Sequence, residues 1–467
     1  AAFGATSVDA DHAEAMDRCI RWLQSVCGCA QEGWERQLAR AIRERYGKDH
    51  TFSVPILMAC TLSGRLGTDG WKCIPALPFE LAALPHQFYG AIRLPVVSYA
   101  LPALIAIGRV LHHKAPSRNV LLRGIRNLLK ARTARILESV QPNNGGFLEA
   151  TPLTSFVLMS LAACGESGSL VALRAAAFLR SSVRKDGSWP IDTNLATWVT
   201  TLAVNALSRQ GGVFRYEQSS VIKEWLLAQQ YRVEHPYTHA APGGWAWTDL
   251  PGGVPDADDT PGALLALLAL GPVDERVRQA GELGTRWLLD LQNKDGGIPT
   301  FCRGWGTLPF DRSGEDLTAH ALRAWSAWLP QWEGALRARV TQAIARGIAF
   351  LEKRQRPEGT WVPLWFGNEH APGEENPVWG TSRVVLALRE MRHSGFDVSQ
   401  EALARGCEAL AAMQQPEGGW SGSGVRGLPC SIEETGMALE ALAGTAHTGA
   451  VDKATLWLVE RVEKGEW

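Results

Sequence analysis

The chain has 467 residues, of which 46% are hydrophobic and 20% charged, and its formal net charge is −1. This length and hydrophobic content can fill the cores of two domains and exclude an extensively disordered chain. The balanced charge argues against a nucleic-acid partner, because nucleic-acid-binding surfaces carry a basic surplus. The 19 tryptophans are unusual and require a structural or functional explanation.

The beginning of the chain, up to His12, has no basic stretch followed by an apolar core, so no signal peptide is predicted. Nine cysteines without regular pairing fit a reduced, cytoplasmic protein better than a disulfide scaffold. The close pair Cys27 and Cys29 is expected to be structural, and no residues have the spacing of a metal site. The apolar stretch from Leu94 to Val110 is interrupted by two prolines and is too short to span a membrane.

The segment from Arg118 to Leu137 interleaves basic and aliphatic residues, with no acid before Glu138. This spacing predicts a basic amphipathic helix. Such a helix can lie on an anionic membrane surface, or it can be an ordinary surface helix with its apolar face turned inward.

A pattern then recurs along the chain: an apolar helix ends in a glutamine, a polar turn with glycine follows, and an aromatic residue comes next. Weaker copies lead to Trp189 and Ile298. The glutamine and the aromatic residue are expected to lock the turn of one repeat onto the next helix, so most tryptophans are stability residues. The strong copies run from Gln141 to Phe147, from Gln229 to Trp245, from Gln355 to Trp361 and from Gln414 to Trp420.

Each aromatic residue is followed by a second apolar run with helical spacing, which disfavours the short strands of a β-propeller. Helix pairs that cannot bury their apolar faces alone must stack on their neighbours. The prediction is an all-α protein with two α/α barrels of helix-pair repeats, residues 1–235 and 236–467. The predicted second helices are 197–207, 261–270, 317–329, 381–388 and 434–442.

Three carboxylates lie within four residues in the segment from Asp256 to Thr260, which leads directly into an apolar run. The segment could cap the helix, hold a cation, or serve in acid catalysis. In apolar surroundings, desolvation and like charge raise carboxyl pKa values, so one member can keep its proton at pH 7. A protonated carboxylic acid among aromatic rings is suited to protonating an alkene or an epoxide.

The glutamine–tryptophan repeats and this acidic motif together resemble the squalene-hopene cyclase family, the class II triterpene cyclases. The resemblance covers nearly the whole chain and implies two α/α barrels. It also implies cyclisation of a linear isoprenoid, such as squalene, through carbocations. By this resemblance Asp258 is the proton donor, flanked by Asp256 and Asp259. His320 would hydrogen-bond to Asp258, and Asp316, four residues earlier on the same helix face, would hold His320.

The resemblance also implies a pocket lined by aromatic rings, which stabilise carbocations and exclude water. Trp247, Trp365 and Trp198 match lining positions of the family. Phe301 stands where the family usually has tyrosine, and Tyr99 stands where hopene-forming members have tryptophan. Ordinary core packing is the alternative role for each of these residues.

The chain departs from the family pattern by lacking most of the first repeats and by stopping at Trp467, inside the final repeat. The substrate therefore stays open: a prenyl diphosphate or a prenylated aromatic is an alternative to squalene. A protein prenyltransferase subunit would need a zinc site, and a catalytically inactive α-toroid used for binding is the remaining alternative. Expected partners are a hydrophobic isoprenoid, a membrane surface bound peripherally and a second copy in a homodimer, with no cofactor and no nucleic acid.

Overall fold

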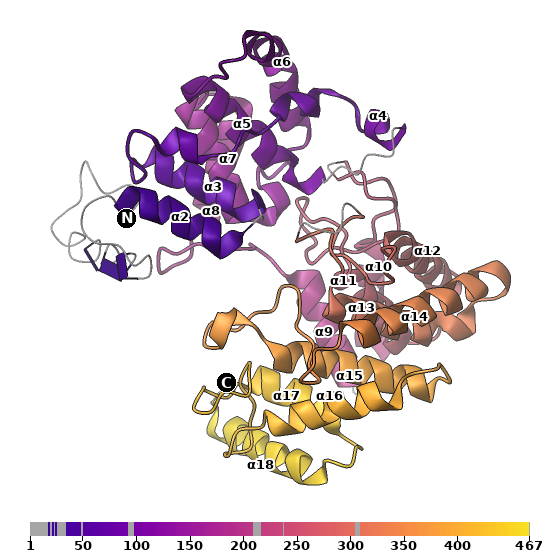
Figure 1. Ribbon diagram of the computed structural model, residues 1–467. Coiled ribbons are helices and arrows are strands. Elements are labelled where there is room, and N and C mark those ends of the chain that lie inside the picture. Colours follow the sequence, from indigo (N-terminus) through magenta and orange to yellow (C-terminus); the bar gives the residue numbers. More distant parts are fainter. Residues whose placement is uncertain are drawn as a thin grey trace. The chain divides into compact units, whose positions relative to one another are not determined.

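The computed structural model describes residues 17–18, 21–22, 24–25, 34–47, 50–91, 98–208, 216–236, 238–303 and 309–466. Within these residues every named element is a helix, and β pairing is limited to three isolated bridges, which confirms the all-α prediction (Figure 1). No helix in this part of the chain combines the length and hydrophobicity needed to cross a bilayer. The stretch up to His12, the pair Cys27 and Cys29, and Trp467 lie outside the described residues.

The chain divides into two compact units. Unit 1 comprises residues 1–194, 236–239 and 250–253, and unit 2 comprises residues 195–235, 240–249 and 254–467. The division falls near residue 195 rather than at the boundary of 235 that the sequence suggested. The reason is packing: α9 (Ala196–Leu207) and α10 (Tyr216–Ala228) contact α11 (Asp259–Ala269) and so belong with unit 2.

Unit 1 has an inner set of helices that contact one another, α3 (His50–Leu62), α5 (Leu101–Lys114) and α7 (Thr151–Ala163). A second helix packs on the outside of each, and the short elements η2 and α4 connect α3 to α5. The core between them includes Met58 and Val110, both fully buried. The remaining helices are α2 (Trp34–Tyr46), α4 (His86–Ala91), α6 (Val120–Ser139) and α8 (Leu170–Ser181), and η2 spans Phe79–Ala83.

Unit 2 repeats an alternation of inner and outer helices. The inner helices α9, α11, α13, α15 and α17 each contact the next, and they begin within a few residues of the predicted second apolar runs. An inner helix such as α11 is apolar on nearly all sides, as expected for a helix covered all round. The other helices are α12 (Glu275–Leu291), α13 (Glu315–Trp328), α14 (Gly334–Arg354), α15 (Pro377–His393), α16 (Gln400–Ala412), α17 (Ile432–Leu442) and α18 (Thr448–Lys464).

The repeat glutamines tie each turn to the following helix. The Nε2 of Gln292 donates to the carbonyl of Gly296 in its own turn at 2.8 Å and to that of Ala343 in α14 at 3.0 Å. In the copy predicted to use Gln229, the next residue, Gln230, makes this pair of contacts. The same double contact is made by Gln141, Gln355 and Gln414.

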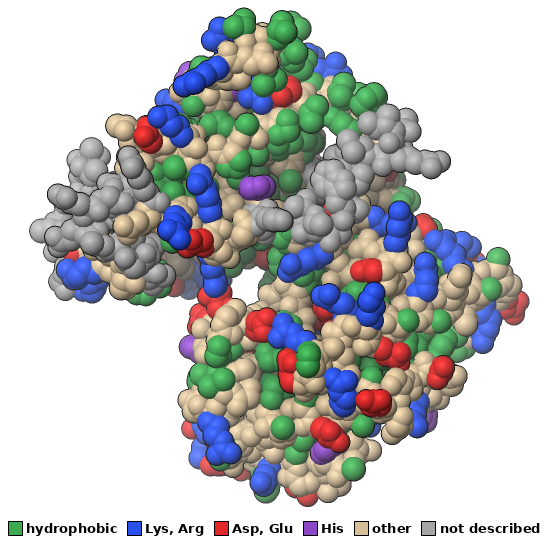
Figure 2. All heavy atoms as spheres, viewed as in Figure 1, with side chains coloured by type: hydrophobic (Ala, Val, Ile, Leu, Met, Phe, Trp, Pro, Cys, Tyr) green, Lys and Arg blue, Asp and Glu red, His purple; other side chains and the backbone are tan. Residues whose placement is uncertain are grey.

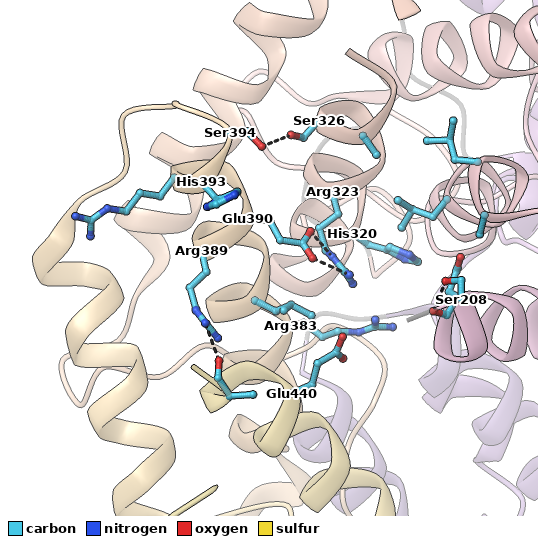
Figure 3. A pocket seen from close by; sticks show the side chains of 18 of the residues that line it. Ser208, His320, Arg323, Ser326, Arg383, Arg389, Glu390, His393, Ser394 and Glu440 are labelled. Carbon is cyan, nitrogen blue, oxygen red and sulfur yellow. Dashed lines mark hydrogen bonds and ion pairs between the residues drawn. The ribbon is translucent and has the colours of Figure 1, made fainter. Parts of the chain in front are cut away.

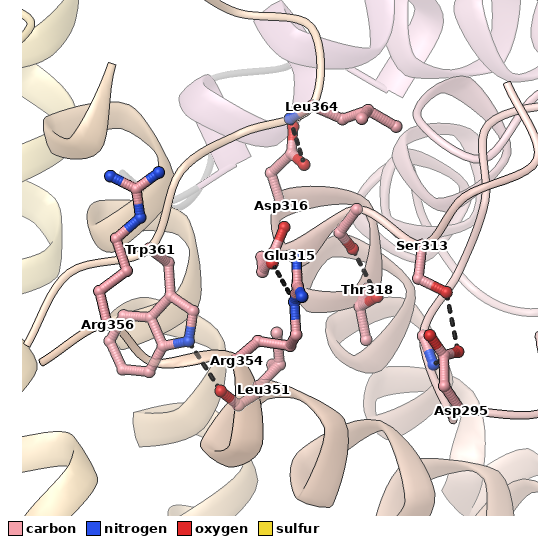
Figure 4. Close-up of polar contacts among 12 residues, drawn as sticks. Asp295, Ser313, Glu315, Asp316, Thr318, Leu351, Arg354, Arg356, Trp361 and Leu364 are labelled. Carbon is pink, nitrogen blue, oxygen red and sulfur yellow. Dashed lines mark hydrogen bonds and ion pairs between the residues drawn. The ribbon is translucent and has the colours of Figure 1, made fainter. Parts of the chain in front are cut away.

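The repeat tryptophans close the end of the preceding outer helix. The indole Nε1 of Trp361 donates to the carbonyl of Leu351 at 2.7 Å (Figure 4), which satisfies one of the helix-end carbonyls that lack a partner within the helix. Trp245, Trp420 and Trp189 make the equivalent bond. The turn glycine lets the turn pack closely against the next outer helix. At Gly243, with φ +127°, a Cβ would lie 2.5 Å from the carbonyl oxygen of Leu283 in α12.

A threonine in the first turn of the inner helix completes the repeat, and the sequence pattern did not reveal it. In the acidic motif, Thr260 Oγ1 accepts a hydrogen bond from the amide of Trp245 at 3.0 Å. The final residue of the motif is therefore a structural residue of the repeat. Thr154, Thr318, Thr381 and Thr435 occupy the same position in the other repeats.

Candidate active site

The acidic motif forms the N-terminus of α11. Oδ1 of Asp256 accepts hydrogen bonds from the amides of Asp258 and Asp259, both at 2.8 Å, so Asp256 caps the helix. The amide of Ala257 donates to the carbonyl of Thr300 at 2.9 Å, which fixes the turn from the other side. The capping role weighed from the sequence thus falls on Asp256, and it leaves the side chain of Asp258 available.

Asp258 is the accessible carboxylate of the three. Its side chain is 18% exposed, whereas Asp256 and Asp259 are each 3% exposed. On the neighbouring inner helix α13, Nδ1 of His320 lies 3.1 Å from Oδ1 of Asp258. The structure therefore brings together the two residues that were expected to form the acid pair.

Asp316 lies one helical turn before His320, and both side chains are buried. Oδ1 of Asp316 accepts from the backbone amide of Leu364 at 3.2 Å (Figure 4), while His320 has its side-chain hydrogen bond with Asp258. The expected hold of Asp316 on His320 is therefore not a hydrogen bond in this structure. Asp316 instead anchors the loop that follows the Trp361 turn.

The carboxyl groups of the site differ in their affinity for protons. Burial, with the charge of Asp258, raises the pKa of Asp256 to about 7. Burial, with the charges of Asp256 and Asp258, raises the pKa of Asp259 well above its usual range. Oδ2 of Asp256 and Oδ1 of Asp259 are buried without another partner, and one proton shared between the two groups accounts for both.

Asp258 behaves in the opposite way. Burial raises its pKa, but hydrogen bonds from His320 and Trp198 and the nearby charge of Arg383 outweigh burial and hold the pKa below the usual value. Burial lowers the pKa of His320, because it disfavours the charged imidazolium, and the charges of Arg383 and Arg323 lower it further. At neutral pH the resting pair is an Asp258 carboxylate beside a neutral imidazole. The pair must gain a proton before it can act as an acid.

Asp316 gives a prediction for stability. Burial, followed by the charge of Asp258, raises its pKa from 3.8 to about 7. The folded state then holds this proton to higher pH than the unfolded state, so the contribution to stability is full below pH 3.8 and is lost as pH rises to about 7. Asp316→Asn keeps an oxygen for the Leu364 amide and should remove about 3 kcal/mol of the stability difference between pH 5 and pH 8, because the loss between pH 5 and the folded-state pKa of about 7 covers two pH units. Urea denaturation at pH 5 and pH 8 measures it, and an unchanged difference would contradict it.

A cavity of about 1550 Å³ lies within unit 2 and is lined by residues from all five inner helices. His320, Arg323 and Arg383 converge on one part of it (Figure 3), and Arg323 is paired with Glu390 by two hydrogen bonds of 2.8 and 3.0 Å. The lining is thus polar and positively charged next to the imidazole. Apolar side chains from α9 and α11, including Leu202 and Leu265, line it as well.

Three of the predicted aromatic residues form one row through a fourth ring, Phe310. The ring centroids of Trp247 and Phe301 are 6.1 Å apart, those of Phe301 and Phe310 are 5.3 Å apart, and those of Phe310 and Trp365 are 4.7 Å apart. The indole of Trp365 donates to Oγ1 of Thr300 at 2.8 Å. Because the carbonyl of Thr300 also binds the acidic turn, this row is attached directly to the motif.

Trp198 belongs to a second group of rings. It stacks on Phe366, which stacks on Trp379 at 4.3 Å, and the guanidinium of Arg383 lies 5.5 Å from the Trp379 ring. Tyr99 is buried and belongs to unit 1, whereas the other predicted aromatic residues belong to unit 2, and its role as a lining residue stays a prediction.

Sequence reasoning missed Arg383, Thr300 and Phe310. Arg383 left a signal, since it is a lone charge within the apolar run expected to form an inner helix. Thr300 and Phe310 lie in loops without a repeat pattern, so only the fold identifies them. Among the described residues, no group of three or more histidine, cysteine or acidic side chains is placed to hold a metal ion.

The solved structure of ent-copalyl diphosphate synthase from Streptomyces platensis shares the α/α fold, with a TM-score of 0.50 and 17% identity over 94% of this chain and 87% of that chain. A family model, the squalene-hopene cyclase C-terminal domain, matches residues 194–467. The chain therefore belongs to the squalene-hopene cyclase family.

Individual relatives agree with this assignment. The squalene–hopene cyclase of Bradyrhizobium diazoefficiens is 27% identical over 309 residues, which cover 58% of this chain and 43% of that protein. Drimenyl diphosphate synthase of Streptomyces showdoensis is 32% identical over 215 residues, 44% of this chain and 34% of that protein. The matched parts thus span less than half the length of these relatives.

Proposed function

We propose that this chain is a class II terpene cyclase in which Asp258 protonates a linear isoprenoid, such as squalene, and starts its cyclisation through carbocations. The observation that carries the proposal is the 3.1 Å contact of Asp258 with His320 in a buried site flanked by two groups of aromatic rings. Family membership supports the same chemistry.

The proposed reaction requires only the chain's own residues. The Asp258 carboxyl transfers its proton to a terminal alkene or epoxide, and the new cation is attacked by successive double bonds. Loss of a proton or addition of water ends the sequence, and a proton returns to the Asp258–His320 pair. Asp256 and Asp259 hold the acidic turn in place, and the rings of Trp247, Phe301 and Trp365 stabilise the cations and exclude water.

The experiment that tests this proposal is direct. Purified protein is incubated with squalene, squalene epoxide and a set of prenyl substrates, and products are separated and identified by mass spectrometry. Cyclised products that form with the natural chain and not with Asp258→Asn support the proposal. If isoprenoids bind but none is converted under any condition, the alternative of a non-catalytic α-toroid is the better interpretation.

The class of substrate gives a second prediction. Protonation of a neutral polyene needs no metal ion, because the charge on the substrate comes from the proton. Turnover of squalene should therefore be unchanged by EDTA. Inhibition by EDTA that is reversed by magnesium would instead favour a prenyl diphosphate, the substrate class suggested by the name of the drimenyl diphosphate synthase relative. A prenylated aromatic substrate is distinguished from squalene and from a prenyl diphosphate by the mass of its cyclised product.

Helix α6 supports a peripheral contact with an anionic membrane, from which a water-insoluble isoprenoid could be collected. Its N-terminal half exposes Leu121 by 79%, Ile125 by 49% and Leu128 by 81%. Positions 121, 125 and 128 lie on one helix face. Lysine and arginine side chains lie beside the apolar ones on this helix (Figure 2), as in helices that bind acidic lipid surfaces.

The membrane contact gives a third prediction. Leu121→Ser with Leu128→Ser should lower binding to anionic liposomes roughly tenfold, because two exposed leucines no longer enter the lipid. The matched control is Leu456→Ser on α18, a leucine that is 72% exposed beside the acidic residues Glu460 and Glu463. Flotation measures binding. If flotation is unchanged while the variant alters the molar mass in solution, the α6 face is instead the contact of a homodimer.

A further inference from the structure

A second cavity, of about 240 Å³, lies between α5 and α6 of unit 1. Its cationic lining comes from both helices: Arg109, His112 and His113 from the end of α5, and Arg123 and Lys130 from α6. This cavity is separate from the acidic motif and has no role in the proposed cyclisation.

The positive charge of this cavity is only partly neutralised. Glu166 is the carboxylate at the site: it accepts from NH2 of Arg109 at 2.6 and 2.8 Å and lies 3.4 Å from Nζ of Lys130. Arg123 pairs with no carboxylate among the residues that the structure describes. Three permanent cations therefore face one anion, and the cavity has an excess of positive charge that favours an anionic ligand.

Two buried polar atoms in the lining lack a partner. Arg109 is 4% exposed and His112 is 9% exposed, yet Nε of Arg109 and Nδ1 of His112 make no hydrogen bond. The other nitrogen of His112, Nε2, is 2.8 Å from Oδ1 of Asn127, so the ring is already oriented. The Nε–H of Arg109 is a buried donor left without a partner, and an oxygen-rich ligand entering the cavity would supply an acceptor for it.

We propose that this cavity binds a phosphomonoester, either the headgroup of an anionic lipid or a free phosphate ester. A phosphate presents several acceptor oxygens to the fork of an arginine and to an ammonium group, which matches Arg109, Arg123 and Lys130. The volume suits a phosphate with a few attached carbons. On α6 the lining positions 123, 127 and 130 lie on the face away from Leu121, Ile125 and Leu128, so the membrane contact of those aliphatic residues does not decide between the two sources. The inference is independent of the cyclisation chemistry.

The test compares two lipids at equal surface charge, set by measuring the zeta potential of the vesicles. Vesicles of phosphatidylcholine contain either phosphatidic acid, a monoester, or phosphatidylglycerol, a diester. The natural chain should bind phosphatidic acid about tenfold more tightly, because only the monoester offers a terminal phosphate to the cavity. Equal binding to the two vesicles overturns the headgroup site and leaves the membrane contact of α6 standing.

Matched variants on one helix separate the cavity from general electrostatics. Arg123→Gln with Lys130→Gln should abolish the preference for phosphatidic acid. Arg132→Gln with Arg135→Gln removes the same charge from α6 outside this cavity, and it should weaken binding to both vesicles while keeping the preference. Loss of the preference in both double variants would mean that charge alone is responsible, and the site would be rejected.

A solution measurement identifies the source of the phosphate. Titration with glycerol 3-phosphate and inorganic phosphate, followed by 31P NMR, should show weak saturable binding that Arg123→Gln with Lys130→Gln removes. Saturable binding in solution without any preference among vesicles keeps the phosphate site and overturns the lipid as its source. Absence of both overturns the inference entirely. Cyclase assays are not needed for any of these outcomes, so failure here is distinct from failure of the proposed reaction.

Discussion

Asp258→Asn is expected to abolish cyclisation, with a loss of more than about 10⁴-fold in turnover. Asparagine keeps the size and the acceptor oxygen of the side chain but cannot supply a proton, and without a strong acid the alkene is not protonated. The helix cap should persist, because the amides of residues 258 and 259 are bound by Asp256 and not by Asp258. Product formation and the circular dichroism spectrum are measured together.

Two further variants separate the acid from its supports. His320→Ala should lower turnover by roughly 10²–10⁴-fold without abolishing it, because the imidazole positions and recharges the acid rather than meeting the substrate. Asp316→Asn should have a smaller effect, since its hydrogen bond is with Leu364. Near-native activity of Asp258→Asn would show that the acid is elsewhere and that the motif serves as a helix cap only.

Trp361→Ala is expected to destabilise unit 2 by about 3–5 kcal/mol, the largest effect on folding that we anticipate from a single truncation. Trp361 is fully buried, and its indole also satisfies the carbonyl of Leu351 at the end of the helix region Phe350–Leu351. The loss therefore combines a large cavity with an unpaired carbonyl. Urea denaturation measures the free energy of unfolding, and hydrogen exchange of α14 to α16 locates the loss.

The chain supplies matched controls for this prediction. Trp189 makes the same bond, to the carbonyl of Leu179 at 2.8 Å, but is 52% exposed. Trp189→Ala should therefore cost only about 1 kcal/mol, the value of one hydrogen bond. Trp361→Phe, which removes the N–H and keeps most of the ring, should lie between the two. Equal losses for Trp189→Ala and Trp361→Ala would mean that the hydrogen bond, rather than burial, stabilises the repeat.

The fold was predictable from the sequence wherever a pattern repeats. Apolar periodicity located the inner helices, and the recurrence of glutamine, glycine and tryptophan indicated helix pairs. The adjacent residues Gln229 and Gln230 show the limit: both end the same helix, and only the register of the turn decides which one reaches Gly243. The unit boundary differed for a similar reason, because the packing of α9 on α11 is a long-range contact.

The candidate site was predictable in its residue types and less so in its contacts. The resemblance to the family suggested both Asp258 and His320, and their contact is present in the structure. Which of the motif's carboxyl groups holds a proton at neutral pH could not be deduced from the sequence. It depends on His320 first and then on Arg383 and Trp198, which lower the pKa of Asp258 from other helices. From the sequence alone, the clustered charges are expected to raise the pKa of every carboxyl group in the motif. In the folded protein the pKa of Asp258 is lowered, whereas those of Asp256 and Asp259 are raised.

The repeated threonine contact has a consequence for the electric field inside unit 2. It occurs in the first turn of α11, α13, α15 and α17. The C-terminal ends of α13 and α15 meet through Ser326 and Ser394, so these two inner helices run in the same direction and their dipoles add. Acidic side chains such as Asp259 and Glu434 lie at the positive ends, and Arg389 binds the carbonyls of Ala441 and Ala443 at a negative end. A negative charge left on Asp258 after proton transfer would lie at the N-terminus of α11, where the helix dipole stabilises it.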